Sequence, residues 1–391
     1  MTGAPPAIGN TVRKRLVVCC DGTWLTSDSL RVSNVEKFAR CVKNEPDIDD
    51  AGEWVQIVHY VAGIGTATGG VGRLWSAAFG TGLLANLVSA YRFLALNYDP
   101  GDEIYIVGFS RGAYTARSLA GMIEQVGLLT PEAVVGNQLR RALILYRSRG
   151  VVRRRRTSTI ATFRRRYCHP GVDIAFLGVF DTVGGLGVPF PSVVQRRYRF
   201  HDVSLGEAVL VARQALALDE GRYRFRPCLW EAPPGSPPIS PDRVRQVWFR
   251  GDHSDIGGGH AETRLSNTTL RWMVAEAERV GLAFNPRLLD MSLQDTETVV
   301  PLRTLGRTYR LINAVVRWST RLAGRRNDRF DGDRRVLEVR PRDVNVYLAR
   351  SAQEFWTTDR RYRSVAANVQ RWWAEFPDET SRALRIEVVP D

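Results

Sequence analysis

Residues 108–112 read Gly-Phe-Ser-Arg-Gly, directly after the strand-like run Glu-Ile-Tyr-Ile-Val at residues 103–107 and before a helical pattern at residues 113–127. This is the G-x-S-x-G pattern in the strand–turn–helix context that its chemistry requires. At such an elbow the serine sits on a sharp turn with its hydroxyl exposed, and the flanking glycines keep the turn from crowding. The pentapeptide alone occurs often by chance, but its context indicates that Ser110 is a nucleophile.

Apolar runs elsewhere in the chain predict a parallel sheet around this elbow. A continuous apolar run is typical of a parallel strand that is covered on both faces, and such runs alternate here with segments of helical spacing. This alternation favours an α/β fold with a mostly parallel central sheet flanked by helices. We expect strands at residues 15–20, 54–61, 103–109, 172–180 and 244–249, and helices at residues 74–98, 113–127 and 131–148, the last with Thr130 as its N-cap.

The length of 391 residues allows a large core and an additional structural unit. We predict a catalytic domain at residues 13–300 and a C-terminal helical appendage or cap at residues 301–391, in which residues 343–376 look helical. Two stretches within the catalytic domain have the composition of insertions: a basic segment at residues 150–168 and a proline-rich loop at residues 231–242.

The formal net charge of +14 is carried almost wholly by arginine, with dense runs at residues 153–156 and 164–166. Such a field favours anionic partners, which include phospholipid headgroups, nucleic acid and acidic proteins. No nucleic-acid-binding motif accompanies the charge, and we expect no nucleic-acid partner. Two interpretations of residues 150–168 remain open: an ordinary solvated surface, or peripheral contact with an anionic membrane.

The apolar segments are too interrupted to predict a membrane-spanning helix. The longest, residues 74–98, is interrupted by Gly80, Gly82, Asn86 and Arg92, whereas a spanning helix needs about 20 apolar residues in a row. Residues 1–10 lack the charged and then apolar pattern of a signal peptide. The five cysteines, an odd number, fit a reducing compartment better than a disulfide framework. These features predict a cytoplasmic location.

A serine nucleophile needs a general base, and the base needs a carboxylate that orients it. In serine hydrolases built on a parallel sheet, the acid and then the histidine follow the serine along the chain, on loops after later strands. Asp181 directly follows the strand predicted at residues 172–180, and His253 follows the strand predicted at residues 244–249. The order therefore predicts Asp181 as the acid and His253 as the base, with Asp255 and His260 as the alternatives in each role.

The tetrahedral intermediate of such a reaction needs two N–H donors as an oxyanion hole. The backbone N–H of Arg111, directly after the nucleophile, is the first candidate. The second is expected from Gly22 and Thr23, which follow the first strand and where glycine permits a close approach of the backbone. The loop at residues 63–66 is the alternative, and its glycines do not have the spacing of a nucleotide-binding motif.

Asp21, Asp181 and Asp255 all follow predicted strands, so they are expected at the same edge of the sheet. Three carboxylates in one place can hold a hard cation. A metal site is therefore an alternative interpretation of these residues, although the serine pattern does not require a metal or any other cofactor.

Six motifs in a fixed order give the chain a family resemblance. They lie at residues 20–24 (Cys-Asp-Gly-Thr-Trp), 33–35 (Ser-Asn-Val), 60–66 (Tyr-Val-Ala-Gly-Ile-Gly-Thr), 108–117 (Gly-Phe-Ser-Arg-Gly-Ala-Tyr-Thr-Ala-Arg), 180–184 (Phe-Asp-Thr-Val-Gly) and 253–259 (His-Ser-Asp-Ile-Gly-Gly-Gly). With these motifs the chain resembles the α/β-hydrolase family of type VI secretion phospholipase effectors and their uncharacterised relatives.

This resemblance implies an α/β-hydrolase-like fold and a hydrolase with Ser110 as nucleophile, Asp181 as acid and His253 as base. It also implies glycerophospholipid substrates, cleaved at an acyl ester. Secretion does not follow from the resemblance, so delivery by a specialised secretion system stays an open alternative to a cytoplasmic location. Two positions depart from the family pattern: Leu25 stands where asparagine often follows the tryptophan, and His260 stands where tyrosine often ends the glycine run. Both departures leave the triad intact and bear on the identity of the substrate.

The residues and the resemblance together predict a serine esterase or lipase that acts on membrane phospholipids. The alternatives are a non-catalytic or regulatory binding module on the same fold and a metal-assisted phosphoesterase that uses the aspartates. Fold alone does not guarantee chemistry, so the geometry of the site has to decide among them.

Overall fold

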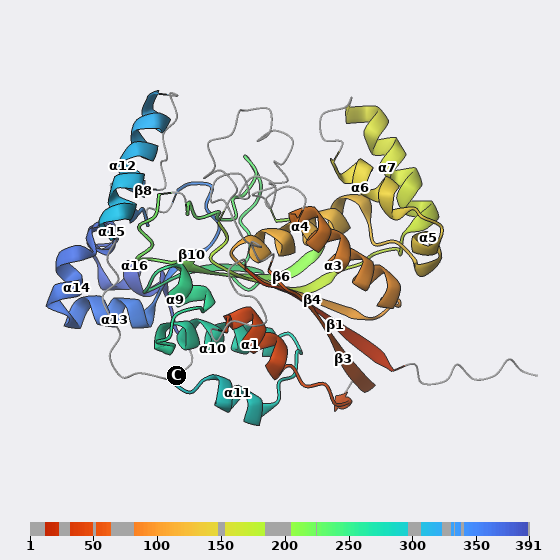
Figure 1. The fold of residues 1–391 in the computed structure, drawn as a ribbon, viewed down its shortest axis with the longest axis horizontal. Coiled ribbons are helices and arrows are strands. Elements are labelled where there is room, and N and C mark those ends of the chain that lie inside the picture. The colour runs from red at the N-terminus through yellow and green to blue at the C-terminus, as the bar shows by residue number, and fades with distance from the viewer. Residues whose placement is uncertain are drawn as a thin grey trace, which may run out of the picture.

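The computed structural model in Figure 1 places most of the chain around one central sheet. The residues that it describes are 12–22, 32–49, 52–63, 82–147, 153–183, 205–223, 225–295, 306–322, 330–331, 333–337 and 340–389.

The central sheet of the described residues has nine strands in the order β11-β10-β7-β6-β5-β4-β1-β3-β2. All neighbouring strands are parallel except β2 and β3, which are antiparallel. This arrangement confirms the prediction of an α/β fold with a mostly parallel sheet. The strands are β1 (Arg13–Cys20), β2 (Asp47–Asp49), β3 (Gly52–Val61), β4 (Glu103–Phe109), β5 (Ile174–Phe180), β6 (Val209–Ala217), β7 (Val244–Phe249), β10 (Val346–Ala349) and β11 (Ile386–Glu387).

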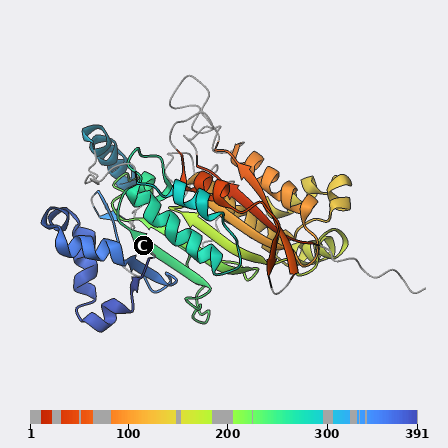
Figure 2. The ribbon, with the colours of Figure 1, turned by 90° about the horizontal axis from the view of Figure 1, so that it is seen from below.

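Helices cover both faces of this sheet. In Figure 1 α3 (Leu83–Asn97) and α4 (Arg111–Val126) lie above the strands, with α5 (Pro131–Val135), α6 (Leu139–Arg147) and α7 (Arg153–Tyr167) beyond them. Below the strands lie α1 (Asn34–Cys41), α9 (His253–Gly257), α10 (Arg264–Glu278) and α11 (Pro286–Ser292). The view from below in Figure 2 shows this second layer in front of the strands.

The alternation of side chains along the strands creates one hydrophobic core on each face. In β1, Leu16 and Val18 join the core that contains the helices α3 and α4, whereas Val17 and Cys19 join the core that contains α1 and α10. Successive side chains of a strand point to opposite faces, so a run that is apolar throughout is buried on both. This explains why the central strands read as continuous apolar runs in the sequence.

The described residues after position 300 add both helices and strands. They form α12 (Arg307–Leu322), the small hairpin of β8 (Phe330–Asp331) and β9 (Arg334–Arg335), and then α13 (Arg350–Thr358), α14 (Arg360–Val365), α15 (Ala367–Glu375) and α16 (Glu379–Ala383). Strand β10 pairs with β7, so this part of the chain extends the central sheet itself. The division of the chain at residue 300 stays a prediction.

Two expectations about individual elements need correction. The helix predicted at residues 131–148 is two helices, because the chain turns at Asn137 with a positive φ of 59°. Residues 343–376 are not helical throughout, because β10 occupies residues 346–349 before the helices begin. Strand β6 was not anticipated. For the helix predicted at residues 74–98, residues 74–81 lie outside the described residues and α3 begins at Leu83.

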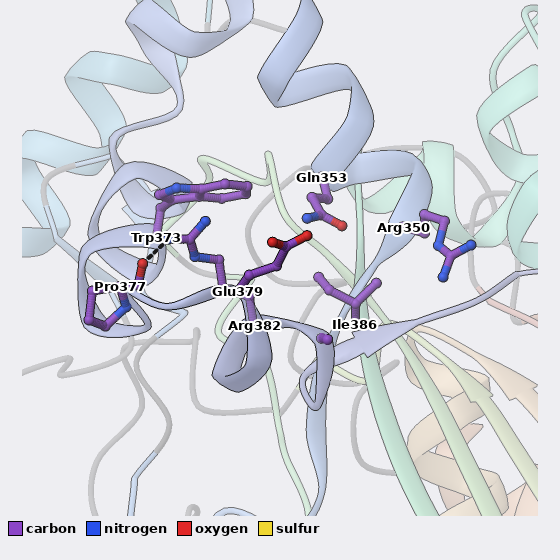
Figure 3. A pocket seen from close by; sticks show the side chains of 8 residues that line it. Arg350, Gln353, Trp373, Pro377, Glu379, Arg382 and Ile386 are labelled. Atoms are coloured by element: carbon purple, nitrogen blue, oxygen red, sulfur yellow. Dashed lines mark hydrogen bonds between the residues drawn. The ribbon is translucent and has the colours of Figure 1, made fainter.

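Among the described helices, none combines the length and the apolar character needed to cross a membrane. A surface cavity of about 610 Å³ lies in the C-terminal part of the chain, shown in Figure 3. None of the residues that we considered as catalytic lines it. Its lining consists of Arg350, Gln353, Trp373, Pro377, Glu379, Arg382, Ala383 and Ile386.

Candidate active site

The predicted elbow is a tight turn between β4 and α4. Ser110 lies between the last residue of the strand and the first residue of the helix, with φ 56° and ψ −116°. A positive φ is costly for a residue with a side chain, and such backbone conformations concentrate at functional sites. The backbone N–H of Ser110 donates to the carbonyl of Phe180 at 3.1 Å, which ties the elbow to the end of β5.

The two glycines of the elbow are required by close backbone contacts. A Cβ on Gly112 would lie 2.0 Å from the carbonyl oxygen of Cys20, and a Cβ on Gly108 would lie 2.6 Å from the carbonyl oxygen of Gly112. These neighbours are backbone atoms, so they cannot rotate away as a side chain can. Glycine therefore lets the start of α4 approach the end of β1 and sets the position of Ser110.

His253 reaches Ser110 from the loop that follows β7. The loop turns at Gly251, with φ 111°, and Asp252 then caps the short helix α9, which begins at His253. His253 Nε2 lies 2.8 Å from Ser110 Oγ, within hydrogen-bond distance. The imidazole ring also packs against two aromatic rings, with centroid distances of 4.7 Å to Phe109 and 4.9 Å to Phe225. Strand end, helix cap and ring packing together fix the orientation of the imidazole.

Asp181 lies on the other side of the same imidazole. It follows β5 directly, has a φ of 38°, and is fully buried. Its Oδ2 lies 2.6 Å from His253 Nδ1, and its Oδ1 accepts a hydrogen bond of 3.0 Å from the N–H of Ala217. With Nδ1–H donating to Asp181, Nε2 is free of a proton and accepts from the Ser110 hydroxyl. The structure thus brings Ser110, His253 and Asp181 into one hydrogen-bonded chain.

Arg335, on strand β9, completes this cluster, and the sequence analysis did not single it out. Its side chain is fully buried, and it donates to both carboxylate oxygens of Asp181, at 2.6 Å from Nη1 and 3.0 Å from Nη2. In the sequence Arg335 is one arginine among many, separated from Asp181 by 154 positions, so nothing local distinguishes it. Arg335 is found only by looking for the cation that pairs with the buried carboxylate of Asp181, and that requires the three-dimensional structure.

The charge of Arg335 controls the protonation of Asp181. Burial by itself raises the pKa of the Asp181 carboxyl, because a buried charge loses its hydration. The adjacent Arg335 guanidinium and the hydrogen bond from His253 outweigh burial, and they hold the pKa of Asp181 well below its usual range. Asp181 is therefore ionised at neutral pH, as a carboxylate that orients an imidazole has to be.

The candidate oxyanion donors have different surroundings. The N–H of Arg111 is the first of helix α4 and directly follows Ser110. The N–H of Gly22 donates to the side chain of its neighbour Asp21, at 2.6 Å from Oδ1. Thr23 and residues 64–66 lie outside the described residues. The roles of Arg111, Gly22 and Thr23 stay predictions.

Asp21 is buried at the end of β1 and is held by hydroxyl groups. Its Oδ2 accepts hydrogen bonds of 2.5 Å from both Ser33 Oγ and Tyr60 Oη. Burial raises the pKa of the Asp21 carboxyl, while the hydrogen bonds from Ser33, Tyr60 and the Gly22 N–H act in the opposite direction. Because Ser33 caps α1 and Tyr60 lies in β3, Asp21 joins three elements of the fold beside the elbow.

The alternative acid and base take part in a capping arrangement. Asp255 Oδ2 accepts from the N–H of Asp252 at 2.9 Å, and Asp252 Oδ1 accepts from the N–H of Asp255, so the two residues form the capping box of α9. His260 Nε2 lies 2.9 Å from Asp252 Oδ1. These contacts stabilise the loop that carries His253, whereas Asp181 is the carboxylate that touches the imidazole.

A metal site built from Asp21, Asp181 and Asp255 has no support in the described part of the chain. There, the group whose potential ligand atoms all lie within 4.8 Å of one another is Asp252, Asp255 and His260. Asp181 is instead paired with the guanidinium of Arg335, 2.6 Å from its Oδ1.

Residues 14–276 match the family model of the catalytic domain of Tle1-like phospholipase effectors of the type VI secretion system (T6SS). The chain belongs to this family. The match confirms the resemblance, and it spans Ser110, Asp181 and His253 but ends before Arg335. Ser110, Asp181 and His253 therefore lie within the part of the chain shared with Tle1-like proteins, whereas Arg335 lies outside it.

The chain is also similar to individual proteins. An uncharacterized protein of Saccharomyces cerevisiae is 26% identical over 420 residues, which cover 72% of this chain and 59% of the yeast protein. A solved structure of the Tle1 effector bound to the VgrG spike of the type VI secretion system matches over 82% of each chain, with 16% identity and a TM-score of 0.42. An uncharacterized protein from Pseudomonas aeruginosa matches over 96% of this chain and 63% of its own, with 18% identity and a TM-score of 0.40.

Proposed function

We propose that this protein is a serine hydrolase that cleaves acyl esters of membrane phospholipids through Ser110, His253 and Asp181. The observation that carries the proposal is the continuous chain of contacts from Ser110 Oγ to His253 Nε2 at 2.8 Å and from His253 Nδ1 to Asp181 Oδ2 at 2.6 Å. Nucleophile, base and orienting acid in hydrogen-bond reach of one another are the geometric signature of an activated serine.

In the proposed reaction His253 Nε2 takes the proton of the Ser110 hydroxyl as Oγ attacks the ester carbonyl carbon. The resulting oxyanion accepts hydrogen bonds from the Arg111 N–H and from a donor near Gly22 and Thr23. His253 then returns the proton to the leaving alcohol, and the acyl group stays on Ser110. A water molecule, deprotonated by the same imidazole, releases the fatty acid and restores the serine.

Asp181 supports both halves of this cycle by stabilising the imidazolium that forms twice. Its low pKa keeps it ionised at any pH at which the protein is expected to act. The strained backbone at Ser110 and the aromatic rings beside His253 hold the two reacting side chains in place before substrate binds. Such preorganisation lowers the barrier without a structural change during the reaction.

The family supports phospholipid as the substrate class, since its members are described as phospholipase effectors. We further propose that residues 150–168 make peripheral contact with anionic lipid. Helix α7 in this segment exposes Arg165 and Arg166 to solvent, and an exposed basic side chain is attracted to an anionic membrane surface by about 1 kcal/mol. This contact would bring the protein to the surface that holds its substrate.

The test is hydrolysis of vesicles made of phosphatidylethanolamine and phosphatidylglycerol, with the release of fatty acid and of the water-soluble headgroup measured separately. We expect release of fatty acid, insensitive to chelators, that Ser110→Ala abolishes without a change in melting temperature. Ser364→Ala, on the exposed side of α14, is the matched control and keeps full activity. Headgroup release that stops with a chelator would replace the proposal with a metal-assisted phosphoesterase, and undiminished activity of Ser110→Ala would refute it.

A further inference from the structure

Arg335 reaches the candidate active site from a part of the chain that lies beyond the family match at residues 14–276. Its guanidinium makes four hydrogen bonds: two with Asp181, one with the carbonyl of Ala217 at 2.9 Å, and one with the carbonyl of Phe225 at 2.7 Å. A guanidinium has five N–H donors. Of these five donors of Arg335, only the N–H on Nε has no hydrogen-bond partner in the described part of the chain.

The geometry of these four bonds fixes the carboxylate of Asp181 in one orientation. A bidentate pair between a planar guanidinium and a carboxylate allows little rotation of either group. The guanidinium is itself fixed by two carbonyls, one at the end of β6 and one in the segment that follows it. Asp181 Oδ2, which Arg335 Nη2 contacts, is the oxygen that contacts His253 Nδ1. Arg335 therefore acts on the imidazole through Asp181.

The hairpin that carries Arg335 is attached to the rest of the fold by polar contacts of the residue that precedes β9. Asp333, two residues before Arg335, accepts hydrogen bonds from Asn313 at 2.9 Å and from Arg317 at 2.8 Å, both in α12. Asn313 in turn accepts from the N–H of Tyr223, in the segment just before Phe225. These contacts join the hairpin that carries Arg335 to α12 and to the segment just before Phe225.

We propose that Arg335 is a positioning residue of the active site, which orients Asp181 against His253 and balances its charge, so that residues after 276 complete the catalytic centre. The proposal rests on the proposed function, because an orienting role matters only if Asp181 and His253 take part in catalysis. It assigns a catalytic consequence to a segment that the sequence suggested to be an appendage.

Removal of the Arg335 charge is expected to shift the pH dependence of the reaction in one definite direction. With Arg335 present, part of the negative charge of Asp181 is compensated, so Asp181 attracts a proton on His253 less strongly. Without it, the imidazolium is stabilised more, and a higher pH is needed to keep the base unprotonated. Charged groups near this pair in the described chain include Glu220, which accepts from the His253 N–H at 3.3 Å and pairs with Arg222. They also include Asp252 and Asp255, the capping box of α9, and His260, which lies 2.9 Å from Asp252 Oδ1 and 3.8 Å from Asp255 Oδ1.

The experiment compares Arg335→Met and Arg335→Lys with the exposed control Arg342→Met in the full-length protein. The probe is the soluble ester p-nitrophenyl butyrate, and kcat, KM and the pH dependence of kcat/KM are measured after circular dichroism has shown the fold. We expect kcat to fall about 10- to 100-fold in Arg335→Met, because a displaced general base loses rate steeply, with KM unchanged. The acid limb of the profile moves to higher pH.

Arg335→Lys tests the geometry, since lysine keeps the charge but cannot bind both oxygens in a plane. We expect it to fold, to restore the acid limb toward the wild-type position, and to recover kcat only in part. If Arg335→Met does not fold, kcat of Arg335→Lys decides whether Arg335 is a positioning residue. A lysine variant with wild-type kcat overturns the positioning role, as does a folded methionine variant with wild-type kcat and pH profile.

The two proposals fail in different ways in this experiment. An inactive wild-type protein, or one whose activity survives Ser110→Ala, contradicts the proposed function. A wild-type protein whose activity depends on Ser110 but not on Arg335 contradicts only the positioning role. Arg342→Met sets the baseline, because Arg342 is about half exposed and its nearest acidic atom, on Glu231, is 3.9 Å away.

Discussion

The replacement Gly112→Ala tests whether the approach of α4 to β1 sets the position of Ser110. The added Cβ would lie 2.0 Å from the carbonyl oxygen of Cys20 and 2.5 Å from that of Asp21, whereas ordinary contact begins at 3.4 Å. Because both neighbours are backbone atoms, the first turn of the helix has to move by about 1 Å or more. A displacement of about 1 Å at a reacting group costs on the order of 100-fold in rate.

The stability change combines two opposing effects. Overpacking of this size typically costs about 1–3 kcal/mol, and replacement of glycine by alanine inside a helix returns about 0.5–1 kcal/mol. We therefore expect Gly112→Ala to remain folded, to lose about 1–2 kcal/mol in the free energy of unfolding, and to lose kcat about 100-fold. The activity loss then exceeds anything that the stability change explains.

Gly121→Ala is the matched control, since it lies in the same helix α4. Its added Cβ would meet the Tyr146 hydroxyl at 3.5 Å, an ordinary contact. We expect a gain of about 0.4–1 kcal/mol in the free energy of unfolding and unchanged kcat. Urea unfolding and ester hydrolysis on both variants provide the measurements. Wild-type kcat in folded Gly112→Ala would refute the view that this contact seats the nucleophile.

Three further outcomes follow from the site. Asp181→Asn should lower kcat about 10⁴-fold, as loss of the orienting carboxylate does in other serine hydrolases. The Arg335 charge that it leaves unpaired should lower the free energy of unfolding in urea by about 3–5 kcal/mol. Wild-type kinetics of Asp181→Asn would contradict the role of Asp181. The pKa of Asp181 is lower in the folded protein than in the unfolded chain, where it is near 4. The contribution of Asp181 to the free energy of unfolding is therefore complete above about pH 4 and decreases by about 1.4 kcal/mol per pH unit below it. The unfolding free energies of wild type and Asp181→Asn should converge only below about pH 4. The double replacement of Arg165 and Arg166 by glutamate should weaken sedimentation with anionic vesicles and leave hydrolysis of a soluble ester unchanged. If the double variant and the wild-type protein sediment equally, the proposed membrane contact of residues 150–168 is wrong.

The sequence predicts the elbow and the strand ends well because their signals are local. A continuous apolar run, a small residue at the turn and a helical pattern after Ser110 lie within about 25 residues of one another. Asp181 follows such a run directly and His253 lies in the short loop after another, so the rule that parallel strands end at one edge of a sheet is enough to place them together. The structure then supplies the distances on which the proposed mechanism depends.

Features that depend on distant contacts could not be predicted in this way. Arg335 is chosen by a buried carboxylate that lies 154 positions earlier, and its own surroundings in the sequence are rich in other arginines. Strand β10 has only four residues, and its place beside β7 is a tertiary contact that leaves a weak local pattern. The break between α5 and α6 depends on a positive φ at Asn137, a residue type that tolerates this conformation without requiring it.

The central claim, that His253 activates Ser110 as a nucleophile, is tested most directly by a fluorophosphonate probe with the site of the adduct located by peptide mass spectrometry. The account predicts one adduct, on Ser110, formed rapidly by the wild-type protein and at a strongly reduced rate by folded His253→Ala. Absence of labelling in the wild-type protein, an adduct on another serine, or an equal labelling rate in His253→Ala would contradict it.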